Sequence, residues 1–277
     1  MKNILVPTDF SECARFAVNT AIDIAKKNDA TIHLLHVVDI PLTSYDAGMN
    51  TYENIPETMF LMEHAKKNME KLIAEKVFDG VNITTIVEFD LTYARISNEA
   101  KNKKADLIVM GSHGASGFKE LVLGSNAERV VRFSECPVLT IKKDRTIFNP
   151  ENIVLASDFT EDSDAFFKQF FNFSSLFDAH LHLLKVNTAV NFETTKISRK
   201  LMEDFIVNHN LEHQNCSVHI YNDETEEDGI INFCDEVDAE LIVIGTHGRT
   251  GIAHLINGSL AENVINHAAR PVLSIKL

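Results

Sequence analysis

Two glycine-rich segments with the same spacing are the residues of this sequence best suited to binding chemistry. Gly111-Ser112-His113-Gly114 is followed, after nine residues, by Gly124-Ser125, and Gly245-Thr246-His247-Gly248 is followed, again after nine, by Gly258-Ser259. Glycine has no Cβ, so backbone N–H groups can approach a phosphate closely. Each Gly-Ser pair precedes a helical pattern, and a helix N-terminus favours anions. The pattern predicts two backbone cradles for a polyphosphate.

The two segments belong to a longer internal repeat. Residues 3–12 match residues 152–161 at an offset of 149, and residues 105–111 match residues 239–245 at an offset of 134. The change of offset places a 15-residue deletion in the second copy, opposite positions 38–82 of the first. A repeat of this length predicts that the chain is built from two similar domains.

The boundary between the copies is expected at a polar turn pair, Asn149-Pro150, which gives domains 1–148 and 149–277. Within each copy, short β-branched runs alternate with longer amphipathic segments. Continuous apolar runs are typical of strands that helices cover on both faces. The alternation predicts an α/β fold with an open parallel sheet in each domain. The expected strands are 4–7, 31–37, 83–89, 107–110 and 138–141, then 153–156, 181–186, 216–221, 241–244 and 272–276, and the expected helices of the first copy are 11–27, 57–78, 93–103 and 126–133.

The composition is that of a globular protein with an acidic excess. The 277 residues are 45% hydrophobic and 24% charged, with a formal net charge of −14. This charge repels the phosphates of nucleic acids and of anionic membranes, so we expect neither as a partner. The four cysteines form no CxxC pair, and we find neither a signal peptide nor an apolar stretch of membrane-spanning length. These features predict a cytoplasmic protein.

The strand ends bring further residues to the glycine segments. Ligands of open α/β sheets bind beyond the carboxyl ends of the strands, where Pro7-Thr8-Asp9, Val37-Val38-Asp39 and the loop after Met110 are expected to meet. A first strand ending in Pro-Thr-Asp, with Gly-x-x-Gly-x9-Gly-Ser after a fourth strand, resembles the universal stress protein family. The resemblance covers essentially the whole chain and is to the ATP-binding branch and its tandem two-domain members. It implies five parallel strands per domain in the order 3-2-1-4-5.

The resemblance also implies a ligand, ATP or else ADP or AMP, with the adenosine near the first and second strand ends and the phosphates on the glycine loop. The implied binding residues are Pro7, Asp9, Val37, Met110, Gly111, His113, Gly114, Gly124, Ser125 and Asn126 in the first copy, and Asp158, Val186, Ile244, Gly245, His247, Gly248, Gly258, Ser259 and Leu260 in the second. The second copy has Ala156 in place of Pro7. Asn126 and Leu260 stand where a small or β-branched residue is usual, but neither change removes a backbone donor. Mg²⁺ is expected only together with a nucleotide.

The function predicted from these residues is that of a regulatory or protective stress-response protein that binds a nucleotide without fast turnover. No Walker-type lysine follows the glycines and we find no arginine finger, so no catalytic residue is predicted. Two alternatives are a slow ATPase or nucleotidyl-transfer enzyme on the same cradle, and a protein-interaction module with vestigial sites. The final strands, 138–141 and 272–275, are open pairing edges, through which we expect the domains to pack as an internal pseudo-dimer. A further homodimer and an unidentified protein partner are compatible with each function.

Four other patterns carry weaker hypotheses. Ser112 and His113 beside Asp9, and Thr246 and His247 beside Asp158, suggest nucleophile triads, but the Gly-x-Ser-x-Gly elbow is missing. His209 and His213 have a metal-binding spacing, but without a His-Glu-x-x-His motif a polar helix is favoured. Six phenylalanines at 166–177 have helical spacing and predict core packing, in part against the other domain, rather than a ligand pocket. The segment 39–58 is either a lid, a binding surface or a disordered connection.

Overall fold

The fold is that of a computed structural model, which describes residues 1–39, 55–114, 123–143, 147–160, 164–211, 215–246 and 260–277. The elements of the first copy are β1 (Asn3–Pro7), α1 (Glu12–Asn28), β2 (Thr31–Asp39), α2 (Ile55–Ile73), β3 (Asn82–Asp90), α3 (Thr92–Asn102), β4 (Leu107–Gly111), α4 (Ser125–Phe133) and β5 (Val138–Ile141). Those of the second copy are β6 (Asn152–Ala156), α5 (Asp164–Ser174), β7 (His180–Asn187), α6 (Thr195–Asn208), β8 (Cys216–Asn222), α7 (Glu226–Glu236), β9 (Leu241–Thr246), α8 (Leu260–His267) and β10 (Val272–Lys276).

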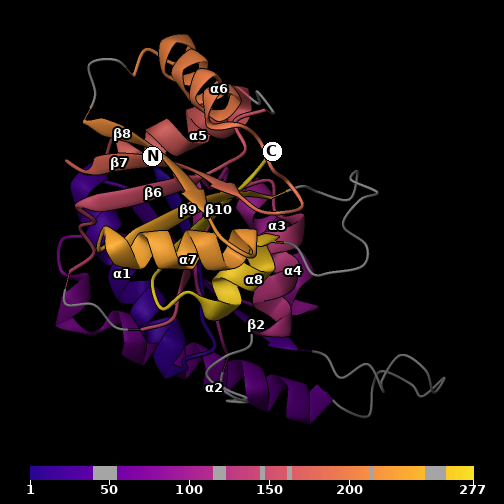
Figure 1. The fold of residues 1–277 in the computed structure, drawn as a ribbon. Coiled ribbons are helices and arrows are strands. Elements are labelled where there is room, and N and C mark those ends of the chain that lie inside the picture. The colour runs from indigo at the N-terminus through magenta and orange to yellow at the C-terminus, as the bar shows by residue number, and fades with distance from the viewer. Residues whose placement is uncertain (40–54, 115–122, 144–146, 161–163, 212–214, 247–259) are drawn as a thin grey trace.

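The described strands form one continuous sheet in the order β3-β2-β1-β4-β5-β10-β9-β6-β7-β8 (Figure 1). Pairing is parallel within each copy, and β5 and β10 pair antiparallel at the centre, with Leu139 opposite Leu273. Each copy therefore has the predicted strand order 3-2-1-4-5. The expected pseudo-dimer through the last strands of the two copies is confirmed.

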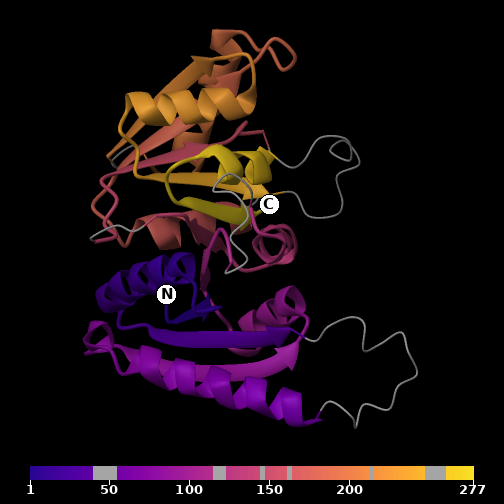
Figure 2. The same cartoon turned by 90° about the horizontal axis from the view of Figure 1, so that it is seen from below.

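Helices cover both faces of this sheet, as the continuous apolar strands predict. Alternate side chains of β1 point to opposite faces, so Ile4 and Val6 belong to one buried cluster and Leu5 to another. The first cluster contains side chains of α1, α2, α5 and α6, and the second contains side chains of α3, α4, α7 and α8. Figure 2 shows the indigo and purple elements of the first copy below the orange and yellow elements of the second. None of the described helices is both long and apolar enough to cross a membrane.

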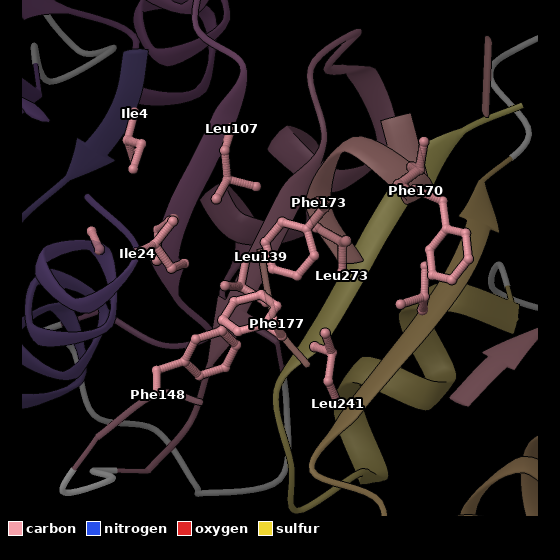
Figure 3. Close-up of a cluster of buried hydrophobic side chains, with 14 of the residues drawn as sticks. Ile4, Ile24, Leu107, Leu139, Phe148, Phe170, Phe173, Phe177, Leu241 and Leu273 are labelled. Carbon is pink, nitrogen blue, oxygen red and sulfur yellow. The ribbon is translucent and has the colours of Figure 1, made fainter. Parts of the chain in front are cut away.

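The phenylalanines of α5 pack into the core and against the first copy, as predicted. Phe166, Phe170 and Phe173 are buried, and Phe177, just beyond the helix, meets Phe148 edge to face at 5.6 Å. Phe148 lies before the predicted domain boundary, and its N–H donates to a carboxylate oxygen of Asp23 in α1 at 2.7 Å. Figure 3 shows this cluster, in which Phe173 and Phe177 lie among leucines and isoleucines of both copies. The apolar core is therefore continuous across the domain boundary.

The predicted element ends agree with the structure to within two residues, apart from α2. The segment 57–78 was expected as one helix, but α2 ends at Ile73 and a separate 3-10 turn covers Lys76–Phe78. Between them Glu75 is extended (ψ 142°), which directs its carboxylate to the guanidinium of Arg15 in α1. Residues 40–54, most of the segment predicted as a lid, binding surface or connection, lie outside the described part of the chain.

Candidate functional site

The predicted site of the first copy lies where the strand order reverses. β1 pairs with β2 on one side and with β4 on the other, so the carboxyl ends of these three strands share one edge of the sheet. Pro7 ends β1, Gly111 ends β4, and Val37 lies two residues before Asp39, the last residue of β2. The topology thus gathers the expected adenosine-binding and phosphate-binding segments at one place.

A tight turn after β1 presents the carboxylate of Asp9. The side-chain oxygen of Thr8 accepts from Phe10 N at 3.1 Å, and Asp9 Oδ1 accepts from Ser11 N at 3.0 Å. Phe10 has a φ of 63°, an unusual value for a residue with a Cβ, which these two local bonds stabilise. Ser11 then caps α1 by accepting from Ala14 N at 3.2 Å. Asp9 is left exposed at the strand end.

The second copy builds the same turn. Ser157 Oγ accepts from Phe159 N and Asp158 Oδ1 accepts from Thr160 N, both at 3.0 Å. Phe159 has a φ of 58°, close to that of its counterpart Phe10. Asp158 is therefore placed as Asp9 is, although Ala156 replaces the proline of the first copy.

The glycines of the first copy allow two backbone segments to meet beside Asp9. A Cβ added to Gly114 would lie 2.8 Å from Asp9 Oδ2. A Cβ added to Gly124 would lie 3.4 Å from the carbonyl oxygen of Ser112 and 3.8 Å from the nitrogen of Gly114. Gly124 N donates to that carbonyl at 2.8 Å and Gly124 is the N-cap of α4. The N-terminus of α4, with Ser125 and Asn126 in its first turn, is thus held against the exit of β4, where Gly114 lies beside the Asp9 carboxylate.

An apolar surface lies beside this cradle. Met110 and Leu123 are buried in one cluster, and the half-buried Val37 packs against it. Asp39, farther along β2, is engaged elsewhere, because its carboxylate accepts from the N–H and the hydroxyl of Thr92 at the start of α3. Asp39 is therefore used in positioning the start of α3.

Two neighbours of the cradle serve packing. Gly111 lies against α1, since a Cβ there would come within 3.0 Å of both the backbone and the sulfur of Cys13. Ser112 is completely buried, and its hydroxyl hydrogen-bonds His113 Nδ1 at 2.7 Å. A hydroxyl without exposed surface cannot reach a substrate, so the geometry disfavours the nucleophile triad.

The described part of the second site differs in its packing. Val186 lies under α7, where a Cβ on Gly229 would come within 2.5 Å of a Val186 methyl. Ile244 is buried, and Gly245 contacts the side chain of Leu277 rather than a cysteine. Leu260 starts α8 and is half-buried. His247, Gly248, Gly258 and Ser259 lie outside the described residues, so the second cradle remains a prediction from the repeat.

An ion pair between a buried lysine and a half-buried glutamate supports the second site and was not predicted. Lys185 Nζ donates to the carbonyl oxygen of Asp158 at 2.8 Å and lies 3.4 Å from Glu193 Oε2. Ser198 Oγ of α6 donates to the same carboxylate at 3.2 Å. The first copy has His36 at this repeat position, which donates from Nδ1 to the Thr8 carbonyl at 2.7 Å. The signal in the sequence is a lysine directly after the apolar pair Leu183-Leu184 of a predicted strand.

The first cradle also contacts the second copy. Leu123 N, just before Gly124, donates to the side-chain oxygen of Asn266 in α8, and Lys142 Nζ donates to the backbone oxygen of Asn266. Burial and, to a smaller extent, the charge of Lys143 lower the pKa of Lys142 to about 8, with Cys13 opposing the shift. Sequence reasoning could not find Asn266, because its role depends on how the domains pack.

No group of three or more histidine, cysteine, aspartate or glutamate side chains in the described ranges has a geometry that could hold a metal ion. His209 lies at the end of α6, where its ring packs on Phe167 at 4.5 Å. Its predicted partner His213 lies outside the described residues. The acidic run 223–228 leads into α7, whose N-cap Thr225 accepts from Asp228 N at 3.0 Å.

Comparison with known proteins places these features in a family. The model of the universal stress protein family matches residues 1–142 and 150–276. A universal stress protein of Methanocaldococcus jannaschii is 38% identical over 151 residues, covering 51% of this chain and 82% of that protein. A universal stress protein of Synechocystis aligns over the full length of both chains at 24% identity. The crystal structure of a universal stress protein from Archaeoglobus fulgidus superposes with a TM-score of 0.76 at 25% identity, covering 99% of this chain and 98% of that one. This chain therefore belongs to the universal stress protein family and carries the family's domain twice.

Proposed function

We propose that the chain binds ATP or a related adenine nucleotide in the cradle of the first domain, residues 1–148, and acts as a nucleotide-dependent regulatory protein in a stress response. The observation that carries the proposal is the close approach of Gly114, Gly124 and Asp9. Gly114 and Gly124 add no side chains here, so the N-terminus of α4 lies close to the exit of β4. Backbone donors at a helix N-terminus are well suited to phosphate oxygens.

The surroundings of the cradle fit the rest of a nucleotide. Val37 and Met110 offer an apolar surface of the kind that packs against a purine base. The exposed carboxylate of Asp9 can accept hydrogen bonds from ribose hydroxyls or from an amino group of the base. Mg²⁺ would arrive with the phosphates, because it is held by phosphate oxygens and water together with few protein ligands.

The second domain, residues 149–277, is proposed to bind a nucleotide more weakly. Asp158 repeats the turn of Asp9, which supports a second site. The tight packing of α7 on Val186 and the contact of Leu277 with Gly245 differ from the first copy, which supports unequal affinities.

Binding without fast turnover is the activity that this site supports best. The only hydroxyl side chain between Gly111 and Gly114 is that of the buried Ser112, and no lysine of the Walker type follows Gly124-Ser125 to neutralise a transferred phosphate. A nucleotide held by backbone donors changes the protein's state through occupancy rather than through chemistry.

Mass spectrometry of the small molecules released from the purified, denatured protein tests this proposal. ATP, ADP or AMP at a defined ratio to protein is the expected result. Incubation of the protein with ATP for hours, followed by the same analysis, distinguishes binding from slow hydrolysis. Steady conversion to ADP would replace the regulatory proposal with the slow ATPase. Absence of any nucleotide, together with no binding of added ATP, would contradict it.

A further inference from the structure

One side chain of the second domain holds the backbone that leads into the first cradle. Asn266 lies in the last turn of α8, and its side-chain oxygen accepts from Leu123 N. Leu123 is buried and directly precedes Gly124, the N-cap of α4. A buried backbone N–H needs a hydrogen-bond partner, and here that partner comes from the other domain.

The backbone of the same residue holds a second segment beside the cradle. Lys142 Nζ donates to the carbonyl oxygen of Asn266, one of the carbonyls at the end of α8 that lack a partner within the helix. A cation at a helix C-terminus is favoured by the helix dipole. Lys142 follows Ile141, whose carbonyl accepts from Ser112 N at 2.9 Å. Asn266 thus contacts Leu123, just before Gly124, and Lys142, next to the residue that pairs with Ser112.

The contacts of Asn266 affect the position of the cradle, because Leu123 is bonded to Gly124, which in turn is hydrogen-bonded to Ser112. Gly124 N donates to the Ser112 carbonyl, so Leu123, Gly124 and Ser112 form one short hydrogen-bonded assembly. Loss of the Asn266 oxygen would leave Leu123 N buried without its acceptor, and the segment would move to reach water or another oxygen. The N–H groups at the start of α4 would move with it. Binding that depends on preorganised donors weakens when those donors lose their fixed position.

The first copy has no asparagine at the repeat position of Asn266. The residue of α4 at the position of Asn266, 134 residues earlier, is Arg132. A guanidinium has no hydrogen-bond acceptor, so Arg132 cannot hold a backbone N–H of the second copy as Asn266 holds Leu123. The Arg132 side chain lies instead over the ring of Phe133, 5.9 Å from its centroid.

We infer that Asn266 is a positioning residue for the nucleotide phosphates in the first cradle, so that the second domain controls the affinity of the first. This inference rests on the proposed function, because it concerns the same cradle. The second domain supports the phosphate site of the first through Asn266, and Arg132, the counterpart of Asn266, cannot make the equivalent contact to the second domain.

The test compares Asn266→Ala with Arg132→Ala, its counterpart in the repeat, in the full chain. Displacement of a fluorescent ATP analogue measures the affinity of the first cradle for ATP and for adenosine, which lacks phosphates. We expect Asn266→Ala to weaken ATP binding about 10-fold, the result of one lost buried hydrogen bond, while adenosine affinity stays within about 2-fold. Arg132→Ala should bind ATP as the wild type does. Amide hydrogen exchange should quicken at residues 123–128 of Asn266→Ala in the absence of any ligand.

The outcomes separate the two claims. If wild-type protein binds ATP and Asn266→Ala binds it equally well, the inference is wrong and the proposed function stands. Equal weakening of ATP and adenosine, with a general rise in hydrogen exchange, would also overturn it, because that result indicates only structural damage. If wild-type protein does not bind ATP at all, the proposed function fails and the inference fails with it.

Discussion

The hydroxyls of Thr140 and Ser274 make the same hydrogen bond in opposite directions across the domain boundary. Thr140 Oγ1 donates to the Val272 carbonyl and Ser274 Oγ donates to the Val138 carbonyl, each at 3.1 Å. The two residues occupy equivalent positions of the repeat, 134 apart, and both are buried. The pair therefore marks the pseudo-two-fold axis that relates the domains, and it ties the side chains of each final strand to the backbone of the other.

Removal of either hydroxyl should destabilise the protein by a similar amount. Thr140→Val and Ser274→Ala each delete one buried hydrogen bond, with an expected loss of about 1 kcal/mol in the free energy of unfolding. Urea denaturation of the two variants measures this loss. A control substitution, Thr85→Val on edge strand β3, should have a smaller effect because Thr85 is exposed. Very different losses for the two variants would contradict the symmetric role of the hydroxyls.

Substitutions of the two partners of the ion pair in the second copy should lower the free energy of unfolding by different amounts. Glu193→Gln leaves the ammonium of Lys185 buried without a negative partner, and should lower the free energy of unfolding by about 1–3 kcal/mol; the exposure of Glu193 limits the loss. Lys185→Met places an apolar side chain of similar length in the same space and should be tolerated better. Urea denaturation compares both with the double variant. If Glu193→Gln is as stable as the wild type, the pair does not support the strand end.

Histidines of the second copy predict a loss of stability at acidic pH. Burial lowers the pKa of His182 to about 4, helped by the charges of His180 and His219, and burial also lowers the pKa of His219. His182 bonds to Asn152 and Ser217, with the ring of Phe233 nearby, so no carboxylate among these contacts compensates a proton.

A group whose pKa is lower in the folded state takes up its proton more readily when unfolded, so stability falls as the pH drops from about 6.5 towards 4. We expect His182 to account for a loss of about 2 kcal/mol between pH 7 and pH 5. Urea denaturation at the two pH values should show a smaller loss for His182→Gln than for the wild type. The same substitution at the exposed His64 should leave the pH dependence unchanged, and equal pH dependence in all three proteins would contradict the assignment.

Much of the fold follows from local patterns in the sequence. Apolar runs such as 107–110 and 138–141 are buried strands because helices cover both faces, and the repeat offset alone pairs each element with its counterpart. The meeting of Asp9 with the glycines of the first copy was also predictable, since parallel strands bring their carboxyl ends to one edge. The helical spacing did not predict where α2 ends. The helix stops before Glu75, which pairs with Arg15.

The contacts that went unpredicted depend on packing between distant segments. The helical spacing of the phenylalanines in α5 defines a face, but only the docking of the domains shows that Phe177 meets Phe148. The sequence shows Lys185 as a charged residue after two leucines of a strand. Its partner Glu193 was not predicted, because it lies in the region that the deletion in the repeat shortens. Asn266 gives no signal at all, because it acts on Leu123 in the other copy.

Calorimetric titration of ATP into wild-type protein, Gly114→Asp and Gly80→Asp determines whether the first cradle binds a nucleotide. An aspartate at position 114 places a second carboxylate beside Asp9 and in the cradle. Gly80 is at the opposite edge of the sheet with open space around it; its φ of 78° makes a side chain there costly for stability, but the site is remote from the cradle. We expect Gly114→Asp to bind one nucleotide fewer than the wild type, or to lose about 100-fold in affinity at one site. Gly80→Asp should bind ATP as the wild type does. Unchanged stoichiometry and affinity in a folded Gly114→Asp protein would contradict a nucleotide site in the first cradle.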